Sequence, residues 1–427
     1  MLSKYKLGEL IDVTRGMSLP GEYYSETGDY IRLTMGNFNY NGGGFKENTS
    51  KTDIYYTGPI RDEYILNKGD IITPLTEQAI GLLGTTAMIP ESGKYIQSQD
   101  VALITCKEDK IDHLFCYYLV SSSIVKKQLS AAAQQTKIRH TSPDKIMDCT
   151  VWIPELEKQR KIGKALYDID QKISLNTRMN VELEAMAKQL YDYWFVQFDF
   201  PNENGKPYKS SGGKMVYNST LKREIPEGWE IKCLNHLVEN YRGVSYNKED
   251  LVSESEESTL VLRGNNIPAS GQFVYDGNVA YIPKSFVSKE QELNKGDIII
   301  TMSSGSKEHI GKCYMFQNDS KHTFGAFLSK FVPHSECRYF VYLCMLSDFF
   351  KAFVKTTCNG TGINNLTNDT FNNVYFPVPT SKILEKFEAI AGCLYNKVGL
   401  CQEQNYDLTH LRDSLLPMLM NGQVTVE

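Results

Sequence analysis

The feature that most limits how this chain can fold is a narrow, mainly apolar stripe within residues 157–193. Alternating steps of four and three residues from its first member give Ile162, Leu166, Ile169, Ile173, Asn176, Asn180, Leu183, Ala187 and Leu190. This heptad spacing is typical of a long helix that packs against one other helix, whereas a helix on a globular core has a broader apolar face. The stretch therefore requires a partner helix.

The same chain supplies a candidate partner 225 residues later. Adding this offset to each position gives Phe387, Ala391, Leu394, Val398, Cys401, Asn405, Leu408, Arg412 and Leu415. Asn405 falls at the position of Asn180, and a polar residue in such a stripe sets register and orientation at a cost in stability. We call the two series together the spacer seam, and we predict that two related helices pair along it.

The globular parts of the chain repeat as well. The heptapeptide at residues 66–72, Leu-Asn-Lys-Gly-Asp-Ile-Ile, recurs without change at residues 293–299. Its glycine, Gly69 in the first copy, suits a turn that leads into a β-branched strand. Further matched residues surround the heptapeptide, but the segments between them differ almost completely. We therefore expect two copies of one scaffold that present different surfaces.

Prolines and a polar stretch divide the chain. Pro154 opens the first long helix and Pro201 ends it, while Pro379 opens the second and Pro417 with Asn421-Gly422 ends it. We predict an α+β fold with two similar mixed α/β domains, joined by two long antiparallel helices that form a coiled-coil spacer with a pseudo-twofold internal repeat. The predicted ranges are 1–153 for the first domain, 154–200 for the first spacer helix, 201–228 for a linker, 229–378 for the second domain, and 379–427 for the second spacer helix and tail.

Composition is that of a globular, reduced, cytoplasmic protein. Hydrophobic residues make up 41% of the chain, and the sequence has neither a long apolar run nor a signal peptide. Ten cysteines without a Cys-x-x-Cys pair argue against a zinc ribbon or a disulfide framework. The formal net charge of -5 is unusual for a nucleic-acid-binding protein, so DNA binding would require local clusters of basic residues or a basic partner.

The length of the predicted spacer nevertheless suits a DNA reader. From Ile162 to Leu190 the seam rises roughly 42 Å at about 1.5 Å per residue, and one turn of DNA separates equivalent grooves by about 34 to 36 Å. Antiparallel pairing would place the two domains at opposite ends of the helix pair, where they could read two short sequences on one face of a duplex. Because their surfaces differ, the two half-sites would differ too.

Several segments together resemble the specificity subunit of type I restriction-modification systems. They are the repeated heptapeptide, residues 152–160 (Trp-Ile-Pro-Glu-Leu-Glu-Lys-Gln-Arg), residues 190–195 (Leu-Tyr-Asp-Tyr-Trp-Phe) and residues 226–229 (Pro-Glu-Gly-Trp). The resemblance covers essentially the whole chain. It departs from the family pattern after Pro379, where Thr380-Ser381-Lys382 replaces the expected Glu-Gln.

The resemblance implies a function and a set of partners. Each domain would be a target-recognition domain that reads one part of a bipartite, asymmetric site in double-stranded DNA. The paired helices would dock modification subunits, expected to number two, which use S-adenosylmethionine to methylate adenine. Restriction subunits would add ATP- and Mg-dependent translocation and cleavage. This chain would itself be no enzyme, hold no cofactor or metal, and associate with no membrane.

Candidate DNA-contacting residues are polar or basic and lie mostly in loops. Asn and Gln can bond adenine bidentately, Arg and Lys can bond guanine, and all can reach phosphate. The loop at 134–140 and its counterpart at 359–365 are the leading segments, and Asn39 and Ser303 are further candidates. The predicted residues are Arg32, Asn37, Gln134, Gln135, Lys137 and Arg139 in the first domain, and Arg263, Asn265, Ser304, Lys307, Thr361, Asn364 and Asn365 in the second. A turn or surface role is the alternative for each of them.

Other patterns favour structure over catalysis. The aromatic residues Tyr117, Tyr118, Phe340 and Tyr342 lie at repeated positions with helical spacing, which predicts a core role and not base stacking. Residues 305–313 have one residue too many for a phosphate loop and end in cysteine, and no Rossmann turn or His pair at metal-ligand spacing is present. Two alternatives stay open: a protein-binding coiled-coil scaffold, and an enzyme with an unrecognised active site.

Overall fold

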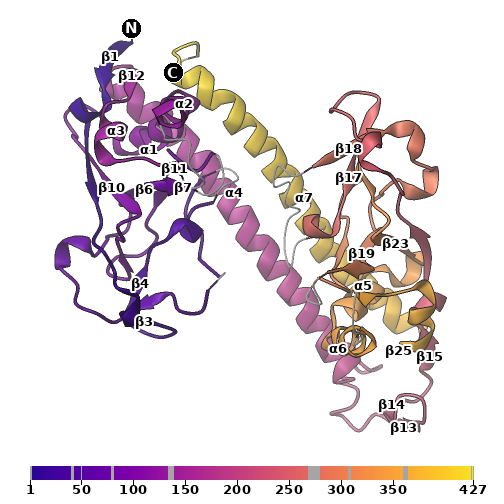
Figure 1. Ribbon diagram of the computed structural model, residues 1–427. Helices are drawn as coiled ribbons and strands as arrows, with labels where there is room; N and C mark the ends of the chain where they lie inside the picture. Colours follow the sequence, from indigo (N-terminus) through magenta and orange to yellow (C-terminus); the bar gives the residue numbers. More distant parts are fainter. Residues whose placement is uncertain are drawn as a thin grey trace. The chain divides into compact units, whose positions relative to one another are not determined.

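The computed structural model describes residues 2–39, 43–49, 51–77, 81–132, 139–267, 279–305, 309–358, 364–424 and 426. The chain forms two compact units (Figure 1). Unit 1 consists of Met1–Ile173 and Tyr406–Glu427, and unit 2 consists of Ser174–Asn405. Each unit therefore combines one globular domain with a segment of each long helix.

Two long helices carry the spacer seam. Helix α4 spans Leu156–Tyr191 and is followed by a π-helical turn at Asp192–Val196, and helix α7 spans Ser381–Met420. Of the predicted end of the second helix, Asn421-Gly422 is right and Pro417 is wrong. Pro417 lies inside α7, and its carbonyl still accepts the N–H of Asn421. Proline removes only its own N–H, so the helix can continue for one more turn, until Gly422 leaves it with a φ of +68°.

Unit 1 is built on a four-stranded antiparallel sheet with the order β2-β10-β6-β8. A second four-stranded sheet, β3-β5-β4-β9, includes the parallel pair β4 and β9, and two-stranded sheets join β1 to β12 and β7 to β11. The strands are β1 Ser3–Lys6, β2 Ile11–Arg15, β3 Tyr24–Ser25, β4 Tyr30–Arg32, β5 Tyr55–Tyr56, β6 Ile71–Pro74, β7 Thr76–Glu77, β8 Ala87–Met88, β9 Tyr95–Ile96, β10 Val101–Cys106, β11 Arg139–His140 and β12 Thr150–Ile153.

Unit 2 repeats this topology. Its four-stranded antiparallel sheet has the order β16-β23-β19-β21, its sheet β18-β17-β22 contains the parallel pair β17 and β22, and two-stranded sheets join β15 to β25 and β20 to β24. The connection between the domains adds a hairpin of β13 and β14. The strands are β13 Met215–Asn218, β14 Arg223–Pro226, β15 Glu230–Cys233, β16 Val238–Arg242, β17 Ser258–Leu262, β18 Ala280–Pro283, β19 Ile298–Thr301, β20 Ser303–Ser304, β21 Cys313–Met315, β22 Thr323–Phe324, β23 Leu328–Pro333, β24 Asn364–Asn365 and β25 Tyr375–Val378.

The repeated heptapeptide forms the same turn in both units. Gly69 and Gly296 have φ values of +93° and +91°, and each turn leads into a central strand, β6 or β19. In unit 1 the Asn67 N–H donates to the Asp70 carboxylate over 2.8 Å, and in unit 2 the Asn294 N–H donates to Asp297 over the same distance. The expectation of a positive-φ turn before a strand is confirmed.

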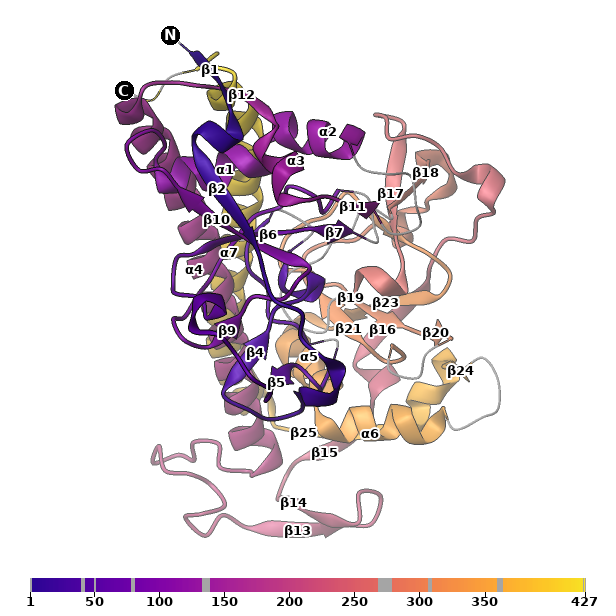
Figure 2. The ribbon, with the colours of Figure 1, turned by 60° about the vertical axis from the view of Figure 1, so that its left-hand side comes forward.

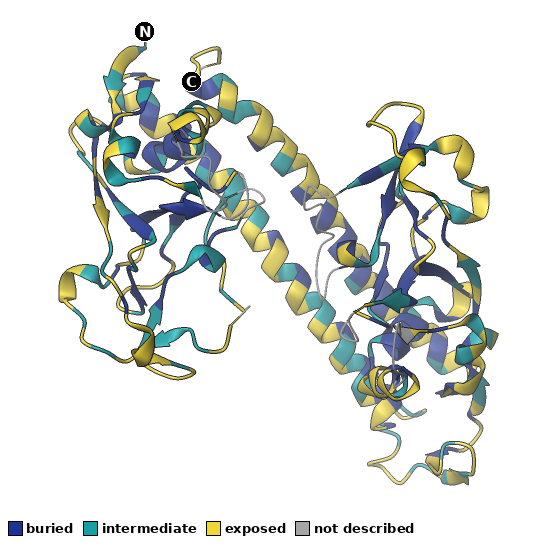
Figure 3. Cartoon of the chain, viewed as in Figure 1, coloured by how far each residue is buried: buried dark blue, intermediate teal, exposed yellow. Residues whose placement is uncertain are grey.

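Short helices pack beside the main sheets. They are α1 His113–Ser121, α2 Ser123–Ala132 and α3 Pro143–Met147 in unit 1, and α5 Arg338–Leu346 and α6 Asp348–Thr357 in unit 2. Tyr117, Tyr118, Phe340 and Tyr342 are buried on α1 and α5, which confirms their predicted core role. Buried residues line the inner faces of these elements, and exposed ones follow the outer loops (Figure 3).

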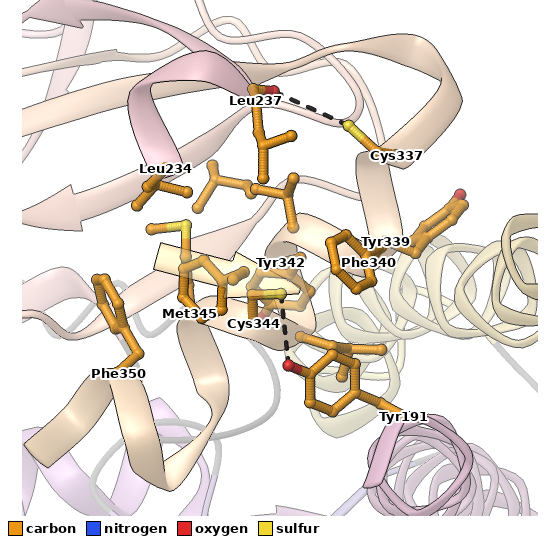
Figure 4. Packing of buried hydrophobic residues seen from close by; sticks show 14 of the residues in the cluster. Tyr191, Leu234, Leu237, Cys337, Tyr339, Phe340, Tyr342, Cys344, Met345 and Phe350 are labelled. Carbon is orange, nitrogen blue, oxygen red and sulfur yellow. Dashed lines mark hydrogen bonds between the residues drawn. The ribbon is translucent and has the colours of Figure 1, made fainter. Parts of the chain in front are cut away.

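The long helices contribute to both cores. In unit 1, Ile162 and Leu166 of α4 share a cluster with Leu419 of α7 and with Phe115 of α1. In unit 2, Tyr191 at the end of α4 points toward α5, where its hydroxyl donates to Cys344 Sγ over 3.4 Å (Figure 4). Each domain is thus packed directly on the long helices.

Contacts within each unit show that α4 and α7 run antiparallel. In unit 1, Arg412 Nη1 donates to Asp170 Oδ1 over 2.9 Å. In unit 2, Asn176 Nδ2 donates to Asn405 Oδ1 over 3.0 Å, and the Trp194 ring contacts Phe387 with centroids 5.8 Å apart. Positions on α7 fall as positions on the first helix rise, which is the order expected for antiparallel partners.

Candidate nucleic-acid interface

A short two-stranded ribbon follows the central strand of the main sheet in each unit. We call β7 with β11 ribbon 1, and β20 with β24 ribbon 2. Figure 2 labels the four strands of these ribbons. In ribbon 1, Glu77 pairs with Arg139, and in ribbon 2, Ser304 pairs with Asn364 and Ser303 with Asn365. The two ribbons are equivalent by position, since β7 follows β6 just as β20 follows β19. The structure thus brings four predicted residues, Arg139, Ser304, Asn364 and Asn365, onto equivalent ribbons.

Ribbon 1 contains an almost buried ion pair. Arg139 Nη1 lies 3.0 Å from Glu77 Oε1, with side chains 16% and 1% exposed. Glu77 Oε2 also accepts the backbone N–H groups of residues 81, 82 and 83 over 3.0, 2.8 and 3.0 Å. Arg139 Nη2 donates to Ser130 Oγ over 3.0 Å. The guanidinium of Arg139 therefore holds the ribbon in place through contacts inside the domain.

Ribbon 2 presents neutral polar residues. Ser303 and Ser304 are half-buried, and Asn365 is exposed. The next residue, Leu366, is buried, and its N–H donates to the carbonyl of Met302 over 2.7 Å. This contact anchors the end of the ribbon to the domain. An exposed amide on an anchored strand can pair with the edge of adenine.

Two predicted residues of the first domain are used in its interior. Arg32 is 6% exposed, stacks on the Tyr24 ring at 3.7 Å and donates twice to the carbonyl of Asp53. Asn37 is 1% exposed, and its Oδ1 accepts the N–H of Thr34 over 2.9 Å. Their polar groups stabilise turns. For Asn37 the sequence carried a signal, because it is matched by Asn266 in the second copy, as other scaffold residues are.

The remaining candidates fall into two groups. Arg263 is half-buried and its Nε donates to the hydroxyl of Tyr246 over 3.2 Å, whereas the neighbouring Asn265 is exposed. Five predicted residues lie outside the described part of the chain: Gln134, Gln135, Lys137, Lys307 and Thr361.

Two residues beside ribbon 1, Lys126 and Lys127, were not among the candidates predicted from the sequence. A cavity of about 270 Å³ is lined by Glu77, Gly81, Leu83, Ser123, Lys126, Lys127 and Ser130. Burial lowers the pKa of Lys126, and the Glu77 carboxylate partly offsets this effect. The Lys126-Lys127 pair was visible in the sequence just before the loop at 134–140. Nothing local marked Glu77 as a buried partner of Arg139.

The spacer seam is buried or half-buried along both helices. In unit 1 these residues are Ile162, Leu166, Ile169 and Ile173 on α4, with Leu408, Arg412 and Leu415 on α7. In unit 2 they are Asn176, Asn180, Leu183, Ala187 and Leu190 on α4, with Phe387, Ala391, Leu394, Val398, Cys401 and Asn405 on α7. The Asn405 side chain forms hydrogen bonds with Asn176 and Thr177.

Within the described residues, the structure holds no group of three His, Cys, Asp or Glu side chains that could bind a metal ion. All ten cysteines lie in the described ranges, and none of them forms a disulfide. None of the helices in the described ranges has an apolar stretch suited to crossing a membrane.

The chain thus has two related domains, each with a differently substituted polar ribbon, and both domains pack on segments of the same two long helices. Residues 2–185 and 226–394 match the family model of the type I restriction modification DNA specificity domain. These two matches cover most of the chain, which therefore belongs to this family.

Individual relatives agree with this assignment. The specificity subunit of the type I restriction enzyme MjaIX of Methanocaldococcus jannaschii is 26% identical over 75% of this chain and 71% of its own length. The HindI specificity subunit of Haemophilus influenzae is 21% identical over 99% of this chain and 100% of its own. The crystal structure of the S subunit of a type I system from M. genitalium has the same fold, with a TM-score of 0.57, 16% identity, and coverage of 98% of this chain and 96% of that chain.

The family assignment settles the class of the protein. The chain is a specificity subunit, as its sequence predicted, and not a catalytic subunit. The α+β fold with two related domains is confirmed as well.

Proposed function

We propose that this chain reads a bipartite, asymmetric site in double-stranded DNA, with one domain for each half-site. The observation that carries the proposal is the pair of ribbons. They have equivalent places in the two domains but unlike chemistry, an ion pair of Glu77 and Arg139 in one and serine with asparagine in the other. Equivalent scaffolds with unlike surfaces are suited to reading two unlike sequences.

The partners in this proposal are two methyltransferase subunits, which dock on the paired helices, and restriction subunits. S-adenosylmethionine, ATP and Mg belong to these partners, and this chain contributes none of them. We assign to the paired helices the task of setting the gap between the half-sites. Since its substrate is DNA, the complex works in the cytoplasm.

Co-expression with a methyltransferase subunit tests the proposal. We expect the complex to methylate adenine at one split sequence whose two halves differ, mapped by sequencing methylated bases in a plasmid library. The purified chain alone should neither methylate nor cleave the same plasmids. Methylation at a continuous site, or activity of the lone chain, would reject the proposal. A complex that assembles without sequence-dependent DNA binding would instead support the scaffold alternative.

A further inference from the structure

The cavity beside ribbon 1 has a positive charge balance. Its one carboxylate, Glu77, is matched by Arg139 and accepts three backbone N–H groups. Lys126 and Lys127 add two ammonium groups to the lining. Within the described residues, the side chain of neither lysine forms a hydrogen bond or an ion pair. Ser123 and Ser130 add two hydroxyl groups to the same lining.

Lys126 is the more informative of the two lysines because its side chain is half-buried. Its stem passes close to Gly84, where an added Cβ would lie 3.1 Å from Lys126 Cγ. Gly84 also has a φ of +81°, which favours glycine. The aliphatic stem of Lys126 is thus confined between the loop that contains Gly84 and the rest of its own helix, α2. Holding a cation in a partly desolvated position costs free energy unless an anion pairs with it.

In the second copy of the repeat, the lysine that matches Lys126 is not confined in this way. Lys351 of α6 corresponds to Lys126 of α2, but its side chain is 62% exposed. Its ammonium lies 3.8 Å from Asp348 Oδ1, one turn earlier on the same helix. The same residue type at the same place in the scaffold is therefore an ordinary surface lysine in unit 2 and a confined cation in unit 1.

We propose that the cavity beside ribbon 1 binds a backbone phosphate of the DNA, with Lys126 as the residue that pairs with it. The proposal rests on the proposed function. It goes further by assigning the point at which the first domain binds the sugar-phosphate backbone. A phosphate at this point would lie next to the ribbon, so it would set the position of the ribbon against the bases. Phosphate contacts of this kind position a protein on DNA without reading sequence.

Salt dependence of DNA binding by the assembled complex with methyltransferase subunits tests this assignment. We expect Lys126→Gln to weaken binding to matched and mismatched sites alike. The slope of log K against log salt should become shallower by about 1, the share of one phosphate contact. Lys126→Arg should keep the wild-type slope. Lys351→Gln is the matched control and should leave both affinity and slope unchanged.

A second uncharged variant, Lys126→Met, keeps the apolar stem and serves if the glutamine variant fails to assemble. A wild-type slope in both uncharged variants, with intact assembly, would overturn the phosphate assignment while leaving the proposed function standing. Failure of the wild-type complex to bind DNA would instead reject the proposed function.

Free inorganic phosphate is the other source of the same chemistry, and a second measurement distinguishes it. If DNA is the ligand, replacing chloride by phosphate at constant ionic strength should shift the melting temperatures of wild type and Lys126→Gln by the same amount. Stabilisation of the wild type alone by phosphate, together with an unchanged DNA salt slope in the variant, would show a free-phosphate site and overturn the proposal.

Discussion

Asp112 and Glu388 accept backbone N–H groups at the start of equivalent helices, α1 and α5, in the two copies of the repeat. In unit 1, Asp112 Oδ1 accepts the N–H of Phe115 over 2.9 Å, so helix α1 carries its own N-cap. Position 337, which matches Asp112 at the common offset, is a cysteine without a side-chain cap. There the carboxylate of Glu388, from α7, accepts N–H groups at the start of α5.

The cap of α5 therefore comes from the long helix. Glu388 accepts the N–H of Tyr339 over 3.0 Å and that of Phe340 over 2.7 Å. On α4, the matching position is Gly163, where an added Cβ would lie 2.5 Å from the N of Phe115. One copy thus needs a glycine where the other needs a carboxylate, because the two domains cap this helix from different sides.

We expect Glu388→Ala to lower the free energy of unfolding by about 1 to 3 kcal/mol, because two half-buried N–H groups lose their acceptor. Glu388→Gln retains one acceptor oxygen and should cost less. Glu385→Ala, at an exposed position of the same helix, is the control and should change stability by no more than about 0.5 kcal/mol. Urea unfolding followed by circular dichroism gives these values. Equal effects at 385 and 388 would contradict the capping role.

Burial also gives Glu388 a pH signature. Desolvation raises its pKa above the ordinary 4.5, although the two backbone N–H groups oppose the shift. Because the folded pKa lies above the unfolded one, the folded state binds the proton more tightly. The protonated Glu388 side chain therefore stabilises the folded state fully at pH values below its ordinary pKa. This contribution is lost as the pH rises through the pKa of the folded state. In Glu388→Gln, this part of the pH dependence should disappear from urea unfolding curves recorded across that window. A wild-type pH profile in the variant would exclude the assignment.

Among the elements, α4 and α7 are distinguished by a buried polar layer in unit 2. Asn176 and Asn405 are 1% and 2% exposed, and Asn176 Nδ2 donates to both Asn405 Oδ1 and Gln404 Oε1. Asn405 Nδ2 donates to Thr177 Oγ1 over 3.2 Å. Within the described residues, Asn176 Oδ1 has no hydrogen-bond partner. A layer of this kind lowers stability but penalises shifted pairings, in which the two amides would no longer face each other.

Double-mutant analysis tests this layer. Asn405→Leu alone should cost about 1 to 3 kcal/mol, because the buried Asn176 amide loses its bond to Asn405 Oδ1 and keeps only the one to Gln404. The double variant Asn176→Leu with Asn405→Leu should be close to neutral or more stable than wild type, which makes the two changes strongly non-additive. Asn396→Leu, on the exposed side of α7, is the control. Additive losses in the double variant would show that the amides do not act as a pair.

At the scale of the whole molecule, the compact units do not follow the order of the chain. Unit 1 takes its last segment, Tyr406–Glu427, from the far end of the sequence, and unit 2 is the continuous stretch between. Each domain therefore folds against helix segments from both copies of the repeat. Exchange of a domain must keep both long helices, because they contribute residues to both hydrophobic clusters.

An exchange of residues 1–153 for those of a relative, with both helices left intact, tests the two-reader organisation. The hybrid complex should recognise a site in which one half-site is new and the other is unchanged, as mapped by methylation of a plasmid library. The reciprocal exchange of residues 229–378 should change only the other half-site. Altered specificity at both half-sites in either hybrid would contradict one domain for each half-site.

The candidate DNA-contacting residues show what could not be predicted from the sequence. Arg32 and Asn37 were predicted because their side chains can form hydrogen bonds with DNA. This capacity does not show which partner each side chain has in the folded protein. Arg32 bonds Asp53, and Arg139 bonds Glu77, which are far away in the chain and close only after folding. Pairing across the ribbons, such as Ser303 with Asn365, depends equally on how distant segments meet. The matched asparagines Asn37 and Asn266 were the one local warning of a structural role.

By itself, the sequence determined the duplication, the heptad stripe on each long helix, the repeated turn before a central strand and the family. Helical period and turn chemistry are set by neighbours in the chain, and the duplication and the family follow from matching residues in order along the sequence. Only the tertiary structure decided that Asn176 meets Asn405, that Glu388 caps a helix of the second domain, and which basic side chains are used internally. These outcomes depend on contacts between residues far apart in the chain, and the same residue types would satisfy many alternative pairings until the packing of the core selects one.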